Sequence, residues 1–140
     1  MSIPDNLFQE VIMGVIFLES EVKKVQTETI TLNDTTFVSS AQPNSNFSYY
    51  PFMYVGTAPS FGQTIGLMQF TLPWLPVSEV DSAVLTLYVY GKTGTAPSTV
   101  VVNRVTAPYN TNTVTYNNQP TFVPTANQVV ITQANVNTTV

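Results

Sequence analysis

Hydrophobic and polar residues alternate over much of the chain after residue 26. The clearest alternation lies in residues 83–90, where it has the period of two that is typical of a half-buried β-strand. One face of this predicted strand carries Leu85, Leu87 and Val89, and the other carries Thr86, Tyr88 and Tyr90. Further runs of β-branched and aromatic residues predict strands at residues 27–32, 35–39, 52–55, 66–72, 99–105, 113–116 and 129–132. Strands this short and this regularly spaced predict an all-β fold, a jelly-roll-like antiparallel β-sandwich.

The first 26 residues follow a different pattern. Apolar residues recur there at spacings of three and four, which is the seam of an amphipathic helix. The residues of this seam are Leu7, Val11, Val15, Leu18, Val22 and Val25. Residues 11–18, however, are apolar on both faces, as in a strand that is buried on both sides. We therefore predict an N-terminal assembly or anchoring segment at residues 1–26, either helix or donor strand, and a sandwich domain at residues 27–140.

The apolar run at residues 11–18 is much shorter than the roughly 20 residues that a transmembrane helix needs, so no membrane span is expected. A signal peptide would place positive charge before this run, but Asp5 and Glu10 precede it. We expect a protein without a recognisable signal peptide that reaches an extracellular surface or a virion particle by another route.

Charge is scarce in this chain. Only 9% of the residues are charged, against about 25% in an average soluble domain. The net charge is −4 and only four residues are Lys or Arg, so nucleic acid is excluded as an expected partner. The low charge suits a packed assembly or an extracellular module.

The chain contains neither histidine nor cysteine. It therefore lacks the usual general base, the usual zinc ligands and every Ser-His or Cys-His nucleophile. Glycoside hydrolysis needs two carboxylates that flank the scissile bond, and after Glu28 the sandwich region offers only Asp34, Glu79 and Asp81. Because Glu79 and Asp81 lie in a predicted connection, we expect no catalytic residue, no metal site, no cofactor and no enzymatic activity.

Aromatic residues in predicted loops are the remaining candidates for a binding site. Sugar recognition typically uses an aromatic surface ringed by amides, and exposed loop aromatics often contact a ligand. The aromatic residues considered are Tyr49, Tyr50, Phe52, Tyr54, Trp74 and Tyr109. The candidates selected for glycan binding are Tyr49, Tyr50, Trp74 and Tyr109. The alternative is that these rings plug the ends of the sandwich.

Several motifs follow one another in a recognisable order. They are DTTFVSSAQPNSNF at residues 34–47, LMQFTL at 67–72, SAVLTLYVY at 82–90 and TVTYNNQP at 113–120. Residues 30–136 thereby resemble the DNRLRE-type domain. This resemblance implies a jelly-roll β-sandwich of bacterial surface and secreted proteins, some of which act as carbohydrate-binding modules.

The resemblance also implies a sandwich that lacks its C-terminal strands, because the relatives continue for several strands beyond the equivalent of residues 129–136. An incomplete sandwich exposes a sheet edge and an apolar groove. The N-terminal segment is the expected filler, either in a neighbouring subunit by donor-strand assembly or in its own domain. A third alternative is that the sequence is a piece of a longer protein.

Two hypotheses for the function follow. The leading one is a non-catalytic structural or attachment subunit of a surface assembly, such as a phage fibre or a bacterial appendage, which forms a homo-oligomer or filament through residues 1–26. The alternative is a carbohydrate-binding module of a cell-surface or secreted protein, with a polysaccharide as its partner.

Overall fold

The computed structural model describes residues 27–30, 32–72, 80 and 82–140. These residues form an all-β fold, as predicted, in which every strand pairing is antiparallel. The strands are β1 (Leu32–Ser39), β2 (Gly56–Ala58), β3 (Gly62–Phe70), β4 (Tyr88–Val89), β5 (Ser98–Val101), β6 (Arg104–Val105), β7 (Phe122–Val123), β8 (Gln128–Ile131) and β9 (Thr138–Thr139). A single turn of 3₁₀ helix, η1 (Gln133–Asn135), is the one helical element of the described residues.

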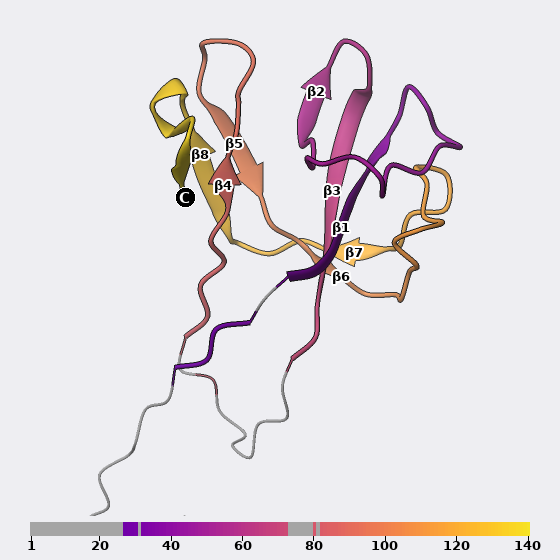
Figure 1. Cartoon of the computed structure of the whole chain (residues 1–140), viewed down its shortest axis with the longest axis horizontal. Coiled ribbons are helices and arrows are strands. Elements are labelled where there is room, and N and C mark those ends of the chain that lie inside the picture. Colours follow the sequence, from indigo (N-terminus) through magenta and orange to yellow (C-terminus); the bar gives the residue numbers. More distant parts are fainter. Residues whose placement is uncertain (1–26, 31, 73–79, 81) are drawn as a thin grey trace, which may run out of the picture.

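The strands are arranged in one three-stranded sheet, β1-β3-β2, and three two-stranded pairs, β4-β9, β5-β8 and β6-β7. The three-stranded sheet lies on one side of the molecule, and β4, β5 and β8 lie on the other (Figure 1). The pairing of β1 with β3 is the longest of the fold, with Phe37 opposite Gly66 and Leu32 opposite Phe70. This pairing therefore carries most of the regular structure, and the other strands are short.

The second half of β1, residues 36–39, is buried on both of its faces. On one face Phe37 stacks on Phe47 with ring centroids 4.6 Å apart. The rings around it complete an aromatic cluster, which consists of Phe37, Phe47, Tyr50, Tyr54 and Phe61. On the other face Val38 packs with Leu67 and Val114. Because neighbouring residues of a strand point to opposite sides, β1 separates the core into these two parts.

Five of the eight predicted strands correspond, wholly or in part, to observed ones. Residues 35–39 lie within β1, residues 129–132 largely coincide with β8, and residues 66–72 overlap the second half of β3. Of residues 83–90, only Tyr88–Val89 belong to a strand. The predicted strand at residues 99–105 is divided into β5 and β6 by the pair at 102–103.

Three predicted strands are wrong. In residues 27–32 only Leu32 has strand structure among the described positions, and residues 52–55 end where β2 begins. Residues 113–116 have no strand structure because asparagines accept hydrogen bonds from their backbone N–H groups. The N–H groups of Thr113 and Val114 donate to the backbone carbonyl of Asn110, and that of Thr115 donates to Oδ1 of Asn118. Side-chain and backbone groups of asparagine commonly compete with strand pairing in this way.

The N-terminal segment of residues 1–26 lies outside the described residues, and with it the choice between helix and donor strand at Leu7, Val11, Val15, Leu18, Val22 and Val25. Within the part of the chain that the structure describes, no helix has the length and apolar character required to cross a membrane.

Candidate functional site

Tyr49 and Tyr50 lie side by side in the loop between β1 and β2, with ring centroids 5.0 Å apart. Their surroundings differ. The ring of Tyr50 is half-buried and belongs to the aromatic cluster, 5.5 Å from Phe37. The side chain of Tyr49 is 76% exposed. Tyr50 therefore packs within the fold, and Tyr49 presents its ring to solvent.

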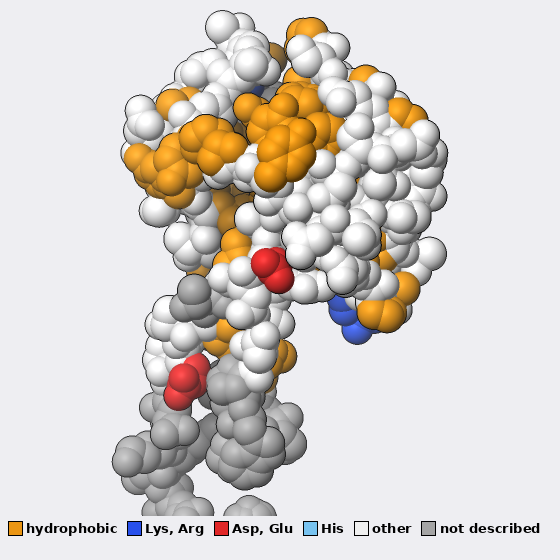
Figure 2. Space-filling model, turned by 45° about the vertical axis from the view of Figure 1, so that its right-hand side comes forward, with side chains coloured by type: hydrophobic (Ala, Val, Ile, Leu, Met, Phe, Trp, Pro, Cys, Tyr) orange, Lys and Arg blue, Asp and Glu red, His pale blue; other side chains and the backbone are white. Residues whose placement is uncertain are grey.

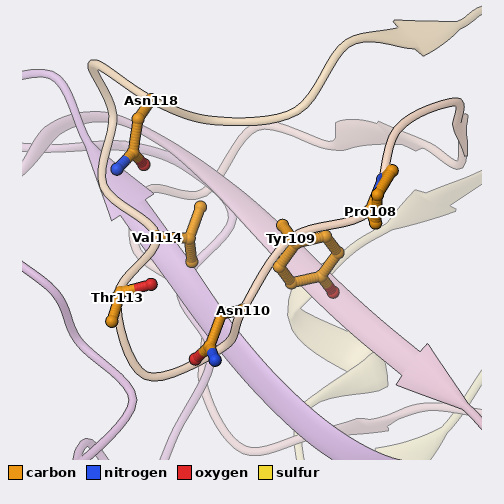
Figure 3. Close-up of a pocket in the computed structure, with 6 residues that line it drawn as sticks. All are labelled: Pro108, Tyr109, Asn110, Thr113, Val114 and Asn118. Atoms are coloured by element: carbon orange, nitrogen blue, oxygen red, sulfur yellow. The ribbon is translucent and has the colours of Figure 1, made fainter.

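Tyr109 lies beside a small cavity of about 200 Å³, and its ring packs against the part of the core around Val38 and Val114. Because Val38 and Phe37 point to opposite faces of β1, Tyr109 and Tyr50 lie on opposite sides of that strand. Figure 3 shows the residues that line the cavity, which are Pro108, Tyr109, Asn110, Thr113, Val114 and Asn118. The structure thus separates two of the predicted glycan-binding residues, and Trp74 lies outside the described residues.

The hydroxyl of Tyr109 is buried and has no hydrogen-bond partner in the described structure. Burial raises the pKa of Tyr109 above its ordinary value, and the nearby carboxylate of Asp34 adds to this shift. Both effects disfavour the phenolate. The hydroxyl of Tyr109 is therefore a buried polar atom that stays neutral and unsatisfied within the described structure.

The buried hydroxyl yields a prediction for Tyr109→Phe. Removing a buried polar group that has no partner is expected to leave the free energy of unfolding unchanged or to raise it by up to about 1 kcal/mol at pH 7. A raised pKa in the folded state also means that stability is lost as pH rises above about 10. Denaturant unfolding at pH 7 and at high pH should show a smaller alkaline loss for Tyr109→Phe than for the parent. The control is Tyr49→Phe at the solvent-exposed ring, and an equal alkaline loss in both variants would contradict the assignment.

A second group of aromatic side chains is exposed on the surface. Phe52, Tyr88 and Tyr90 are 44%, 47% and 63% exposed, respectively. The rings of Phe52 and Tyr90 are 4.9 Å apart and those of Tyr88 and Tyr90 are 4.7 Å apart. We call these three residues the aromatic platform. Phe52 comes from the β1–β2 loop, and Tyr88 and Tyr90 lie on the outer face of the segment that contains β4.

The part of the chain that the structure describes carries little charge, since its only charged side chains are Glu28, Asp34, Lys92 and Arg104. Figure 2 shows that hydrophobic side chains gather in the upper part of the visible face, above the acidic side chains. Lys92, which follows Tyr90 by two residues, donates from Nζ to the carbonyl oxygens of Thr93, Gly94 and Ala96 at 3.3, 3.1 and 2.6 Å. The ammonium of this lysine is thus held by its own loop.

The sequence pattern assigns Tyr88 and Tyr90 correctly to the outer face of residues 83–90, but it does not identify them as binding residues. The sequence signal that could have identified them is the presence of two large aromatic residues on the solvent side of a predicted strand. Phe52 was among the aromatic residues considered, but it was placed in a predicted strand and was not selected. Its contact with Tyr90 joins positions that are far apart in the sequence. Within the described residues, no group of acidic, histidine or cysteine side chains could hold a metal ion.

Comparison with known proteins gives one family match. The model of carbohydrate-binding module family 96 matches residues 26–140, which is most of the chain. No curated protein and no solved structure gives a match. The match supports the expected relation to carbohydrate-binding modules, and the narrower DNRLRE-type assignment stays a prediction. The chain belongs to carbohydrate-binding module family 96.

Proposed function

We propose that this protein is a non-catalytic module that binds a polysaccharide on the aromatic platform. The supporting observation is the platform itself, three exposed rings in mutual contact on a chain that belongs to a family of carbohydrate-binding modules. Contiguous exposed apolar side chains of this kind mark binding surfaces. The face of an aromatic ring is negative, so it attracts the partly positive C–H groups on the face of a sugar ring.

The charge around the aromatic platform favours a neutral glycan. Lys92 is engaged by three carbonyl oxygens of its own loop, and the whole chain carries a net charge of −4. An acidic polysaccharide would be repelled at long range by this charge, and Lys92, the cation that follows the platform in the sequence, is oriented into its own loop. We therefore propose stacking on a neutral polysaccharide, with hydrogen bonds to the amide and hydroxyl groups nearby.

The predicted residues contribute to this proposal unequally. Tyr49 is exposed and lies in the same loop as Phe52, so we propose it as a further stacking position. Tyr50 and Tyr109 are assigned to packing because their rings lie in the two parts of the core. A glycan contact at Trp74 stays a prediction, because this residue lies outside the described structure.

The test is binding to a panel of insoluble neutral and acidic polysaccharides, measured by depletion of the protein from solution. Tyr90→Ala is expected to weaken binding to the neutral ligand by about tenfold or more, as expected for truncation of a central aromatic contact. Phe52→Ala should also weaken binding. The control is Phe122→Ala, which removes an aromatic ring of similar exposure, 47%, outside the platform and should leave binding unchanged. Unchanged binding in Tyr90→Ala and Phe52→Ala, or binding to acidic polymers alone, would refute the proposal.

The family match favours this function over the leading sequence hypothesis of a structural or attachment subunit. A homo-oligomer, a filament and a virion location receive no support from the match or from the described structure. We propose an extracellular, cell-surface or secreted setting, which accompanies carbohydrate binding.

A further inference from the structure

An apolar groove of about 450 Å³ runs between β3 and the segment that forms β5 and β6. Its walls come from separate parts of the fold. Prominent lining residues are Ile65, Leu67, Leu85, Leu87, Val100 and Val102. In a closed sandwich these side chains would lie in the interior. Protein interiors contain few voids larger than a water molecule, so we expect a groove of this size and character to be filled.

One wall of the groove also has an incomplete backbone ladder. In the described residues β5 is paired on its β8 side only, from Ser98–Ile131 to Val101–Gln128. On the neighbouring wall, Leu87 exchanges two backbone hydrogen bonds with Val140, and residues 83–86 belong to no strand. An apolar groove bordered by unpaired strand edge is the surface that an added strand occupies.

We propose that residues 11–18 of the same chain lie in this groove as a β-strand. Their sequence, VIMGVIFL, contains no charged residue and is apolar at both odd and even positions. This is the composition of a strand that is covered on both faces. The other stretch outside the described residues, 73–79, contains Pro73, Pro76 and Glu79, and proline cannot donate to a ladder.

The point at which the chain enters β1 supports occupation by the same molecule. Leu32 pairs with Phe70, and Phe70 lines the groove, so the polypeptide arrives at the edge of the groove itself. The roughly 14 residues from Leu18 to Leu32 can extend over about 46 Å. The strand β3, with 9 residues, is about 30 Å long, so the connection is long enough to turn back. A tethered segment has a high effective concentration, which favours it over a second copy.

The proposal changes the role of three predicted assembly residues. Val11, Val15 and Leu18 become core residues of their own domain instead of contacts between subunits. It does not depend on glycan binding, and the two proposals can fail separately.

The absence of cysteine from the chain makes a single introduced thiol a specific reporter. In the full-length protein, Leu87→Cys and Val102→Cys place a thiol in the groove, and Val84→Cys, at a side chain that is 86% exposed, is the matched control. We expect the two groove thiols to react with a maleimide at least about tenfold more slowly than the control, because reaction requires the segment to leave. Adding Ile16→Asp should restore fast reaction at both groove positions and leave the control unchanged.

The oligomeric state decides between the two sources of the segment. Protection in a monomer, measured by light scattering and independent of protein concentration, is the expected result. Groove thiols that react as fast as Val84→Cys would overturn the proposal, because the groove would then be open. Protection that is lost on dilution would also overturn it, since the occupant would be a second copy. The two groove positions are independent, so a variant that fails to fold leaves the other as the test.

Discussion

Phe37→Ala is expected to lower the free energy of unfolding by about 3–5 kcal/mol, a large part of the 5–15 kcal/mol that is typical of a domain. The ring of Phe37 is completely buried and contacts four other rings, with Phe47 at 4.6 Å and Phe61 at 5.3 Å between centroids. Truncation removes apolar burial, leaves a cavity and breaks the aromatic pairs, which each contribute about 0.5–1.5 kcal/mol beyond their buried area. Urea or guanidinium titration, followed by fluorescence, measures the change.

The matched control is Phe52→Ala, the same truncation at the exposed ring of the aromatic platform. It is expected to cost no more than about 0.5–1 kcal/mol of stability, as do most surface substitutions. The two variants are thus expected to affect different properties. Phe52→Ala weakens glycan binding and leaves stability nearly unchanged, whereas Phe37→Ala lowers the stability of the fold. Equal loss of stability in both would show that the core is not centred on the aromatic cluster.

Asn46→Asp is expected to destabilise the protein by about 2–4 kcal/mol at pH 7. The amide nitrogen Nδ2 of Asn46 donates to the carbonyl oxygens of Thr111 and Val114 at 2.9 and 2.8 Å. Its Oδ1 accepts from the backbone N–H and the hydroxyl of Ser48. The amide thereby links the β1–β2 loop to the turns at residues 110–114. The substitution replaces the donor with a carboxylate oxygen that faces two carbonyl oxygens.

The destabilisation by Asn46→Asp should depend on pH. The carbonyl oxygens disfavour the charged form, so they raise the pKa of the new carboxyl in the folded state. Stability is then recovered as pH falls toward and below the ordinary value of about 4, and lost as pH rises through the raised value. Unfolding titrations at several pH values compare it with Asn44→Asp, which has the same charge but keeps the Oδ1 acceptor for Asn117. An equal effect at both positions would contradict the assigned role of the Asn46 amide.

The sequence predicts those parts of the fold in which burial alone determines the strand. The second half of β1 is covered on both faces, and residues 35–39 were found from their β-branched and aromatic character. In residues 83–90 the two faces were assigned correctly: Leu87 lines the groove and Tyr88 is exposed. Among the described residues, backbone pairing in this segment involves only residues 87–89: Tyr88–Val89 pair with β9, and Leu87 exchanges two hydrogen bonds with Val140. A strand needs a partner as well as a pattern, and the local pattern cannot reveal that partner.

The candidate site was less predictable because it depends on contacts between distant positions. Tyr49, Tyr50 and Tyr109 were chosen for their position in loops, and only the tertiary packing distinguishes the exposed Tyr49 from the other two. The aromatic platform is formed when the β1–β2 loop brings Phe52 to Tyr90. Residues 113–116 show that the prediction of strands is limited in the same way. The backbone carbonyl of Asn110 accepts hydrogen bonds from N–H groups that a strand would have used for pairing.

The polar links between the loops of this protein are made by neutral groups. Asn44 joins Asn117 at 2.8 Å, and Thr106 joins Thr121 at 2.7 Å. Amides and hydroxyls do not titrate between mild acid and mild alkali, and dissolved ions screen them little. Hydrogen bonds of this kind keep their strength in brine and in acidified media, so the segments that they join are expected to keep their arrangement when the ionic conditions around the protein change.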